Sequence, residues 1–154
     1  MPDKITSYFK EGSNWGIRIH YVHEDVLSGT AGALPRFRDW LREDRDFLVM
    51  YGDILTNQPL APIKVLHQNS DAFATLLLHR RQSSNSFVEL SPEGRVINFI
   101  ERPSSDVWTL LQRQHPKGFL VNSAIQFLNS HVLDYIEKHN CFDLPRDVYM
   151  KVFR

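Results

Sequence analysis

The stretch Phe47-Leu-Val-Met-Tyr-Gly-Asp-Ile-Leu-Thr-Asn57 is the part of the sequence that best predicts the fold. Its apolar residues run almost without interruption into Gly52 and Asp53, which is how a buried parallel strand ends. In an open α/β sheet, ligands collect beyond the carboxyl ends of the strands. We therefore expect Asp53 to face a binding crevice, with Gly52 allowing a tight turn or a close approach of the ligand.

The carboxylate of Asp53 has two interpretations. It suits a hard divalent cation such as Mg²⁺, which takes few protein ligands and is usually shared with substrate phosphates. Alternatively, Asp53 caps the next helix or closes a turn. The stretch alone does not separate these interpretations, so the rest of the chain has to decide between them.

The composition is that of one globular domain. The 154 residues are 42% hydrophobic and 12% aromatic, which is enough for a core. The 18 Lys and Arg balance the 18 Asp and Glu and form no basic block, which argues against nucleic acid or an anionic membrane as a partner. The single Cys141 excludes an internal disulfide and fits a reducing compartment. Because no apolar run approaches membrane-spanning length and no signal peptide is evident, we expect a cytoplasmic protein.

The order of apolar patterns predicts an α/β fold. Strands are expected at 17–22, 47–51, 72–78, 87–90, 95–100 and 118–128, and helical segments at 3–9, up to 41, at 59–67, after Ser130 and from Pro145. Ser91-Pro-Glu-Gly94 is typical of a hairpin turn, which adds an antiparallel part to a parallel sheet. Residues 104–117 are expected to form a polar loop or insertion.

Three further sites carry polar groups that could bind a ligand. Gly29 and Gly32 leave backbone amides open before a helix, although for an isolated Gly-x-x-Gly a tight turn with close helix packing is the preferred explanation. Glu101 and Arg102 follow a strand, where they could bind a polyol and a phosphate or remain solvated charges. Asn122 lies inside an apolar strand and needs hydrogen-bond partners, either sugar hydroxyls or the neighbouring backbone.

Together these motifs resemble the sugar-1-phosphate nucleotidyltransferases, the NDP-sugar pyrophosphorylase family that includes mannose-1-phosphate guanylyltransferase. The resemblance covers nearly the whole chain. The matching motifs are Asn14-Trp-Gly-Ile-Arg-Ile19, His23-Glu24, Leu27 to Leu34, Tyr51-Gly-Asp-Ile-Leu-Thr-Asn57, Ile100-Glu-Arg-Pro103, Val121-Asn-Ser-Ala124 and Phe142-Asp-Leu-Pro-Arg-Asp147.

The resemblance implies a fold and a reaction. The fold would be α/β, with a three-layer, Rossmann-like mixed sheet that is mostly parallel, has an antiparallel hairpin and carries helices on both faces. The reaction would transfer a nucleotidyl group from an NTP to a sugar 1-phosphate and release pyrophosphate, with Mg²⁺ as cofactor. Because the protein mainly positions the reactants in such a reaction, no residue is assigned as catalytic.

The resemblance also implies binding roles. Gly29, Thr30 and Ala31 would contact the nucleotide, and Asp53 would bind Mg²⁺ near the ribose. Glu101 would take sugar hydroxyls, Arg102 would lie beside the phosphate, and Asn122 would hold the sugar.

The chain departs from the family pattern at several points. The Gly-x-Gly-Thr-Arg-Leu loop and the Pro-Lys segment that hold the triphosphate are absent, and so is a second metal-binding Asp after the last helix. Ser86 and Ala124 stand where Gly occurs, and Arg102 replaces Lys, which keeps the charge but not the geometry. Residues 1–154 therefore resemble the central portion of a single nucleotidyltransferase domain.

The missing first strand has an expected consequence. In this fold that strand lies centrally in the sheet, so its absence would leave an unpaired edge and an exposed apolar face. We expect the chain alone to have little or no transferase activity and to self-associate as a homo-oligomer.

Three functional hypotheses remain. The first is a sugar nucleotidyltransferase, and local similarity at 27–34 and 51–55 points to GDP-mannose or a related product, although the sequence does not fix the base or the sugar. The second is a non-catalytic module that binds a nucleotide sugar or regulates an enzyme. The third, an unrelated receiver or flavodoxin type, would show a repeated βα pattern and no antiparallel hairpin at 87–100.

Overall fold

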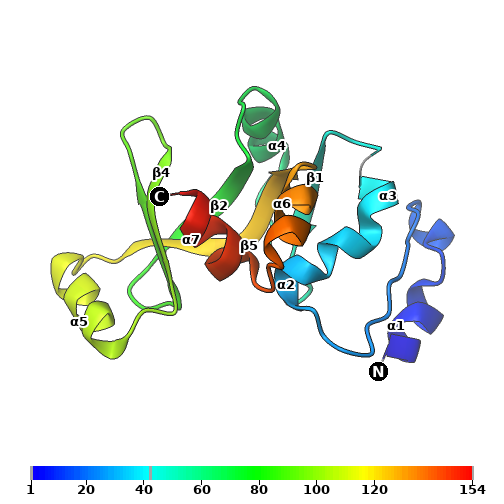
Figure 1. Cartoon of the computed structure of the whole chain (residues 1–154), viewed down its shortest axis with the longest axis horizontal. Helices are drawn as coiled ribbons and strands as arrows, with labels where there is room; N and C mark the ends of the chain where they lie inside the picture. Colours follow the sequence, from blue (N-terminus) through cyan, green and yellow to red (C-terminus); the bar gives the residue numbers. More distant parts are fainter. Residues whose placement is uncertain (1, 42, 154) are drawn as a thin grey trace.

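The computed structural model describes residues 2–41 and 43–153, which form a five-stranded sheet with helices around it (Figure 1). The strands are β1 (Asp46–Met50), β2 (Ala74–Arg81), β3 (Ser86–Leu90), β4 (Val96–Glu101) and β5 (Phe119–Asn129). The α-helices are α1 (Pro2–Phe9), α2 (Gly29–Gly32), α3 (Arg38–Leu41), α4 (Ala61–Gln68), α5 (Ser105–Gln114), α6 (Val132–His139) and α7 (Met150–Val152). The 3-10 helices η1 (Ser13–Trp15) and η2 (Leu34–Phe37) and the π-helix η3 (Leu144–Tyr149) complete the described fold.

Strand β5 is the centre of the sheet. At Leu128 it pairs with Phe47 of β1 on one edge and with Ala74 of β2 on the other, and at Leu120 it pairs with Val88 of β3. These pairings and the β3–β4 hairpin are all antiparallel. The prediction of a mostly parallel sheet is therefore wrong for the described residues. Strands β1 and β2 do run in the same direction, but β5 lies between them with the opposite direction, and an apolar run indicates burial rather than strand direction.

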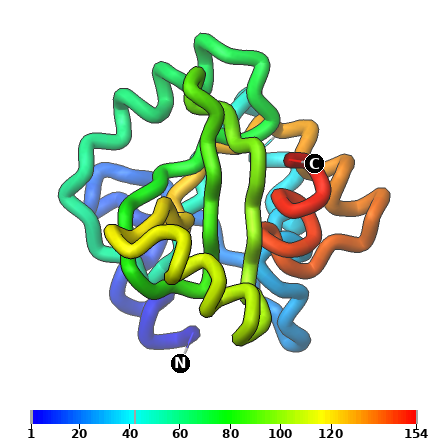
Figure 2. The backbone as a smooth tube through the Cα atoms, turned by 90° about the vertical axis from the view of Figure 1, so that its left-hand side faces the viewer, coloured from blue at the N-terminus to red at the C-terminus, as the bar shows by residue number. Residues whose placement is uncertain are grey.

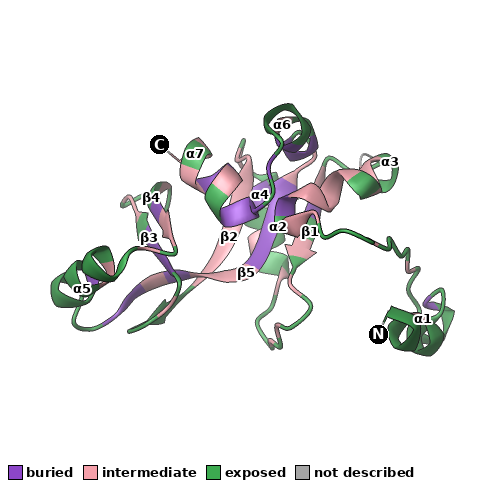
Figure 3. Ribbon diagram, turned by 60° about the horizontal axis from the view of Figure 1, so that its bottom comes forward, coloured by how far each residue is buried: buried purple, intermediate pink, exposed green. Residues whose placement is uncertain are grey.

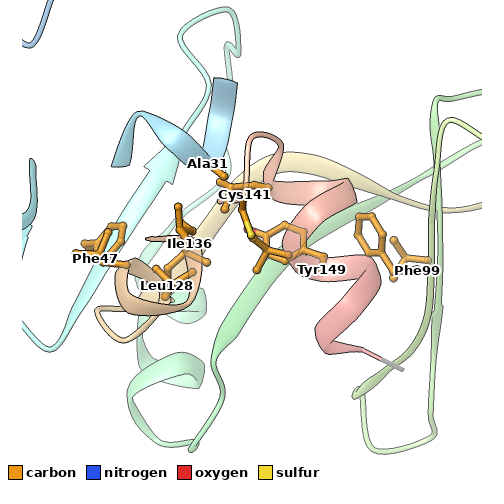
Figure 4. Close-up of a cluster of buried hydrophobic side chains, with 12 residues drawn as sticks. Ala31, Phe47, Phe99, Leu128, Ile136, Cys141 and Tyr149 are labelled. Atoms are coloured by element: carbon orange, nitrogen blue, oxygen red, sulfur yellow. The ribbon is translucent and has the colours of Figure 1, made fainter. Parts of the chain in front are cut away.

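Helices lie on both faces of the sheet. The ring of His67 in α4 lies near Phe127 of β5, with ring centroids 6.1 Å apart. Leu128 comes next on the strand and so points to the opposite face, where it joins the main core under α6 and η3. Figure 3 shows the buried positions gathered along β5, and Figure 4 shows Leu128, Ile136 and Tyr149 within this core.

The helix α6 covers this face because its apolar residues share one side. Val132, Leu133 and Ile136 are buried at helical spacing. The helix expected after Ser130 is thus present, with His131 as its N-cap, and Asn129 Oδ1 accepts a hydrogen bond from the backbone N–H of His131 at 3.0 Å. The expected helices at 3–9 and 59–67 are present as α1 and α4, and the segment ending at residue 41 forms α2, η2 and α3.

The β3–β4 hairpin was predicted, but the helix beside it was not. Residues 105–114 form α5, where a polar loop was expected. Ser104 caps this helix by accepting a hydrogen bond from Val107 N at 3.5 Å, and Leu111 is buried against Phe119 and Val121 of β5. The spacing of the apolar residues Val107, Leu110 and Leu111 was the signal for a helix here, and the surrounding polar residues concealed it.

The N-terminal part of the chain packs loosely. Residues 17–22, expected to form a strand, have no strand pairing among the described residues, and Figure 3 shows α1 held away from the sheet by an extended segment. Strand β1 ends the sheet on this side, and its Leu48 and Met50 are 40% and 44% exposed. The expected open strand edge is thus present, whereas self-association remains a prediction. Within the described ranges, no helix has the length and apolar character needed to cross a membrane.

Candidate functional site

Strand β5 changes neighbours near its middle, and this change opens the candidate site. Pairing with β1 begins at Ile125, and pairing with β3 is at Leu120. We call residues 122–124, between these pairings, the fork. On one side of the fork, Ser86 Oγ accepts a hydrogen bond from Asn122 N at 3.0 Å; on the other, Ala124 O accepts one from Tyr51 N at 3.2 Å. The fork thereby brings the end of β1 close to the start of β3.

Asn122 shapes the fork with its side chain. Its Oδ1 accepts a hydrogen bond from Ala124 N at 3.1 Å, and Ala124 has a φ of 56°. The sequence left two partners open for the Asn122 side chain, sugar hydroxyls or the neighbouring backbone. Its oxygen is bonded to the backbone. The Nδ2 group makes no hydrogen bond to the part of the chain described, so it can still donate to a sugar hydroxyl.

The end of β4 carries two charges to the same place. Ser86 pairs with Glu101 across the hairpin, and Arg102 follows directly. Arg102 Nε lies 3.8 Å from Glu101 Oε1, and Arg102 Nη2 lies 3.6 Å from Asp143 Oδ2. The arginine side chain is 62% exposed, whereas those of Glu101 and Asp143 are 11% and 12% exposed. The guanidinium thus faces solvent beside two largely covered carboxylates.

Asp143 is fixed at the start of η3. Its Oδ1 caps η3 by accepting a hydrogen bond from Arg146 N at 2.9 Å. Figure 2 shows η3 and α7 beside β4, and the packing of these elements places Asp143 near Arg102. This acid was not predicted as a site residue. Its place two residues before Pro145, at a helix start, was the available signal.

Thr30 and Tyr51 complete the group. Thr30 Oγ1 accepts a hydrogen bond from Leu144 N at 3.0 Å. Tyr51 lies close enough to Thr30 and to the charged residues Glu101, Arg102 and Asp143 for each of them to affect the pKa of its hydroxyl. We call Glu101, Arg102, Asp143, Thr30 and Tyr51 the acid–arginine cluster. The structure thus brings together three predicted residues, Thr30, Glu101 and Arg102, from segments far apart in the sequence.

The cluster favours a protonated carboxyl. Burial, followed by the nearby Asp143, raises the pKa of Glu101 to about 7, and Arg102 only partly opposes this. The weak opposition is explained by the exposure of Arg102, because water screens its charge. Burial also raises the pKa of the Tyr51 hydroxyl. Near neutral pH, Glu101 can therefore either accept or donate a hydrogen bond.

Gly29 and Ala31 are engaged in packing. A Cβ on Gly29 would lie 2.2 Å from Phe142 O, and the φ of this glycine is 77°. Ala31 is fully buried, and its N–H donates to Phe142 O at 2.9 Å. These contacts agree with the close-packing interpretation of the glycines and leave Thr30 as the exposed member of the three predicted nucleotide-binding residues. Contact of this segment with a nucleotide remains a prediction.

Asp53 lies in a different hollow. It is exposed and lines a groove of ≈ 490 Å³ together with residues that include His79, Arg81 and Ser123. We call this the Asp53 groove; Thr30, Glu101 and Asn122 do not line it. No group of three metal-binding side chains occurs among the described residues. A Mg²⁺ ion at Asp53 would have this one carboxylate from the described residues and would need further oxygens from substrate phosphates, so the role of Asp53 as a metal ligand remains a prediction.

Comparison with known proteins identifies the family. A family model described as nucleotidyl transferase matches residues 2–150. The chain belongs to this family. The resemblance of the sequence motifs to the sugar-1-phosphate nucleotidyltransferases is thereby confirmed.

Individual nucleotidyltransferases show the same relationship. The chain is similar to the mannose-1-phosphate guanylyltransferase catalytic subunit beta of Dictyostelium discoideum, with 28% identity over 79% of the chain and 32% of that protein. It is also similar to the UTP–glucose-1-phosphate uridylyltransferase of Synechocystis, with 27% identity over 99% of the chain and 41% of that protein. The chain thus spans about a third to two fifths of the length of these relatives.

A solved structure shares the fold. The chain is similar in structure to the HddC protein of Yersinia pseudotuberculosis, with a TM-score of 0.69 and 16% sequence identity. The match covers 96% of this chain and 60% of the HddC chain. At this identity the match concerns the fold alone. The antiparallel pairings around β5 therefore belong to a fold that is found in a solved protein.

Proposed function

We propose that this chain contributes the sugar-phosphate-binding part of an enzyme that transfers a nucleotidyl group from an NTP to a sugar 1-phosphate. The products would be an NDP-sugar, of the GDP-mannose type, and pyrophosphate. The pairing of a largely covered Glu101 with an exposed Arg102 next to the fork is the observation that carries this proposal. A sugar phosphate needs both a hydrogen-bonding group for its hydroxyls and a cation for its phosphate.

The residues of this chain would position the substrates. Arg102 would contact the phosphate, since its guanidinium is exposed and only loosely paired. Glu101 and the free Nδ2 of Asn122 would bind sugar hydroxyls, and Thr30 would approach the nucleotide. The proposed metal ligand is Asp53, and a Mg²⁺ ion held there with substrate phosphates would neutralise their charge. Holding the reactants in line in this way lowers the entropic part of the barrier.

The product type is proposed from the relatives. Mannose-1-phosphate guanylyltransferases occur repeatedly among the similar proteins, which favours a guanine nucleotide and mannose. A uridylyltransferase for glucose 1-phosphate is similarly close, so the choice of base and sugar needs a direct test.

A second candidate function is binding without turnover. Ala31 donates its backbone N–H to Phe142 O, and Gly29 packs against Phe142, so these groups are already occupied and would not hold phosphates in the arrangement observed. This observation favours a module that binds a nucleotide sugar or regulates an enzyme. The acid–arginine cluster would serve either function.

A thermal-shift series tests the proposal. The melting temperature of the chain would be measured with GDP-mannose, UDP-glucose and dTDP-glucose, each with and without Mg²⁺. A ligand at a hundred times its Kd stabilises the folded chain by about 2.7 kcal/mol. We expect the largest shift with GDP-mannose and a smaller one in Arg102→Gln. The absence of any shift with all three ligands would contradict the proposal, and an assay of pyrophosphate release would separate the transferase from the binding module.

A further inference from the structure

One polar side chain lies in the middle of the main core. Gln126 of β5 is fully buried, and neither its Oε1 nor its Nε2 has a hydrogen-bond partner among the described residues. Val49 of β1 and Leu76 of β2 pair with Gln126 across the sheet, so the three side chains form a row on the same face. A leucine would fit this row without leaving a polar group unpaired. Because an unpaired buried amide costs free energy, Gln126 needs a partner beyond the described residues.

A second unpaired group lies on the same side of the sheet. Tyr149 of η3 is fully buried in the main core, and its hydroxyl has no hydrogen-bond partner in residues 2–41 and 43–153. Its ring packs against Phe99 of β4, with ring centroids 5.7 Å apart (Figure 4). Burial, and then the nearby Tyr51, raise the pKa of the Tyr149 hydroxyl well above its ordinary value. The hydroxyl therefore keeps its proton and can both donate and accept a hydrogen bond.

Tyr51 connects these two groups to the acid–arginine cluster. Its backbone N–H donates to Ala124 O, which continues the register that pairs Val49 with Gln126. The side chains of Tyr51 and Gln126 therefore project from neighbouring rows of the same sheet face. Tyr149 lies close enough to Tyr51 for that residue to affect its pKa. Two fully buried, unpaired polar groups thus lie next to the half-buried Tyr51 of the cluster.

We propose that Gln126 and Tyr149 hold one internal water, and that this water positions Tyr51 for binding of the sugar phosphate. Globular proteins contain about one buried water per 27 residues, and such a water makes about three hydrogen bonds to groups that are otherwise unpaired. The amide of Gln126 offers an acceptor and a donor group, and the hydroxyl of Tyr149 offers one of each. The hydroxyl of Tyr51 would be the third partner. The positioning role rests on the proposed function, whereas the water site does not.

A high-resolution crystal structure of the whole chain tests the water site. We expect electron density for a water within about 3.2 Å of both the Gln126 amide and the Tyr149 hydroxyl. Gln126→Leu should lack this water, and its Tyr51 side chain should lie in a different position from that in the natural chain. No water between the amide and the hydroxyl, or an unmoved Tyr51 in Gln126→Leu, would overturn the inference.

Stability and binding together test the positioning role. Gln126→Leu should keep or raise the melting temperature, because leucine fits the apolar row, and should weaken binding of mannose 1-phosphate about fivefold. Tyr149→Phe should weaken binding to a similar extent. In a double-mutant cycle the two changes should not add, since either change removes the same water. Tyr135→Phe is the matched control, because this tyrosine packs on Phe73 at the end of β5 away from the fork, and it should bind like the natural chain.

Equal affinities of the natural chain, Gln126→Leu and Tyr149→Phe would overturn the positioning role, whatever their melting temperatures. Failure of the proposed function would look different: the natural chain would not bind mannose 1-phosphate, while its crystal structure would still show the water. That result would remove the positioning role and keep the water site. Conversely, binding that depends on Arg102, but neither on Gln126 nor on Arg95 at the hairpin turn, would leave the proposed function intact and remove only the role of the water.

Discussion

The acid–arginine cluster and the Asp53 groove differ in how much of each is assembled before a ligand arrives. In the cluster, Glu101 and Asp143 are nearly covered, and Arg102 already contacts both. In the groove, Asp53 is exposed, and Arg81 keeps an unpaired charge within the described structure. Buried charged groups need hydrogen-bond or ion-pair partners within the protein, whereas exposed charged groups are solvated by water and remain available to a ligand. The cluster should therefore influence folding stability, and the groove should influence mainly binding.

The largest expected difference concerns two glycines. Gly29→Ala should lower the free energy of unfolding by about 3 kcal/mol, because the new methyl meets Phe142 O at 2.2 Å and φ is 77°. Gly52→Ala next to the groove is the matched control. A Cβ there has no neighbour within 4 Å, so the change should stay within about 0.5 kcal/mol. Urea unfolding measures both, and equal effects would show that the two regions are packed alike.

The next difference concerns pH. The pKa of Glu101 is raised to about 7 in the folded chain, from an ordinary value of 4.5. Between these values the folded chain holds a proton that the unfolded chain has released, so the contribution of Glu101 to stability is lost as pH rises through this window. We expect a loss on the order of 2 kcal/mol between pH 4.5 and pH 7. Glu101→Gln should flatten the curve of unfolding free energy against pH, and an unchanged slope in this variant would contradict the buried-acid description.

A smaller effect is expected at the fork. Ala124→Gly should raise the free energy of unfolding by about 1 kcal/mol, because a φ of 56° strains alanine but not glycine. Ala33→Gly provides the control. Ala33 has a helical φ of −71°, so the same substitution there should lower the free energy of unfolding by about 1 kcal/mol. Thermal unfolding should show a higher melting temperature for Ala124→Gly and a lower one for Ala33→Gly. A shift in the same direction for both variants would argue against strain at Ala124.

The smallest effect on stability is expected at the groove itself. Asp53→Asn should change the free energy of unfolding by less than about 0.5 kcal/mol, because the side chain is exposed and makes no ion pair in the described structure. Asp143→Asn in the cluster is the informative counterpart and should destabilise the chain more, since Asp143 both caps η3 and faces Arg102. A larger loss of unfolding free energy in Asp53→Asn than in Asp143→Asn would contradict the expectation that the cluster, rather than the groove, contributes to stability.

The sequence predicted local elements better than their arrangement. The apolar run at 47–51 and the turn at 91–94 were enough to place β1 and the hairpin, because both signals are local. The direction of β1 was missed, since it depends on β5, whose pairing residues lie more than seventy positions away. Helix α5 was missed because polar residues surround Val107, Leu110 and Leu111 and concealed their helical spacing.

The candidate site shows the same limit. Glu101, Arg102 and Thr30 were predicted from motifs, and the structure brings them together. Asp143, which contacts Arg102 and raises the pKa of Glu101, was overlooked because its role depends on packing between η3 and β4. Asp53 was expected beside these residues, yet it lines a separate groove because the chain turns away after Tyr51.

The central claim is that Glu101 and Arg102 hold a sugar phosphate, and calorimetric titration of mannose 1-phosphate tests it most directly. The natural chain should bind this ligand, Arg102→Gln should bind it about tenfold more weakly, a difference of about 1.4 kcal/mol, and Arg95→Gln should bind it like the natural chain. Equal affinities for the natural chain and Arg102→Gln, or no binding by the natural chain, would contradict the claim.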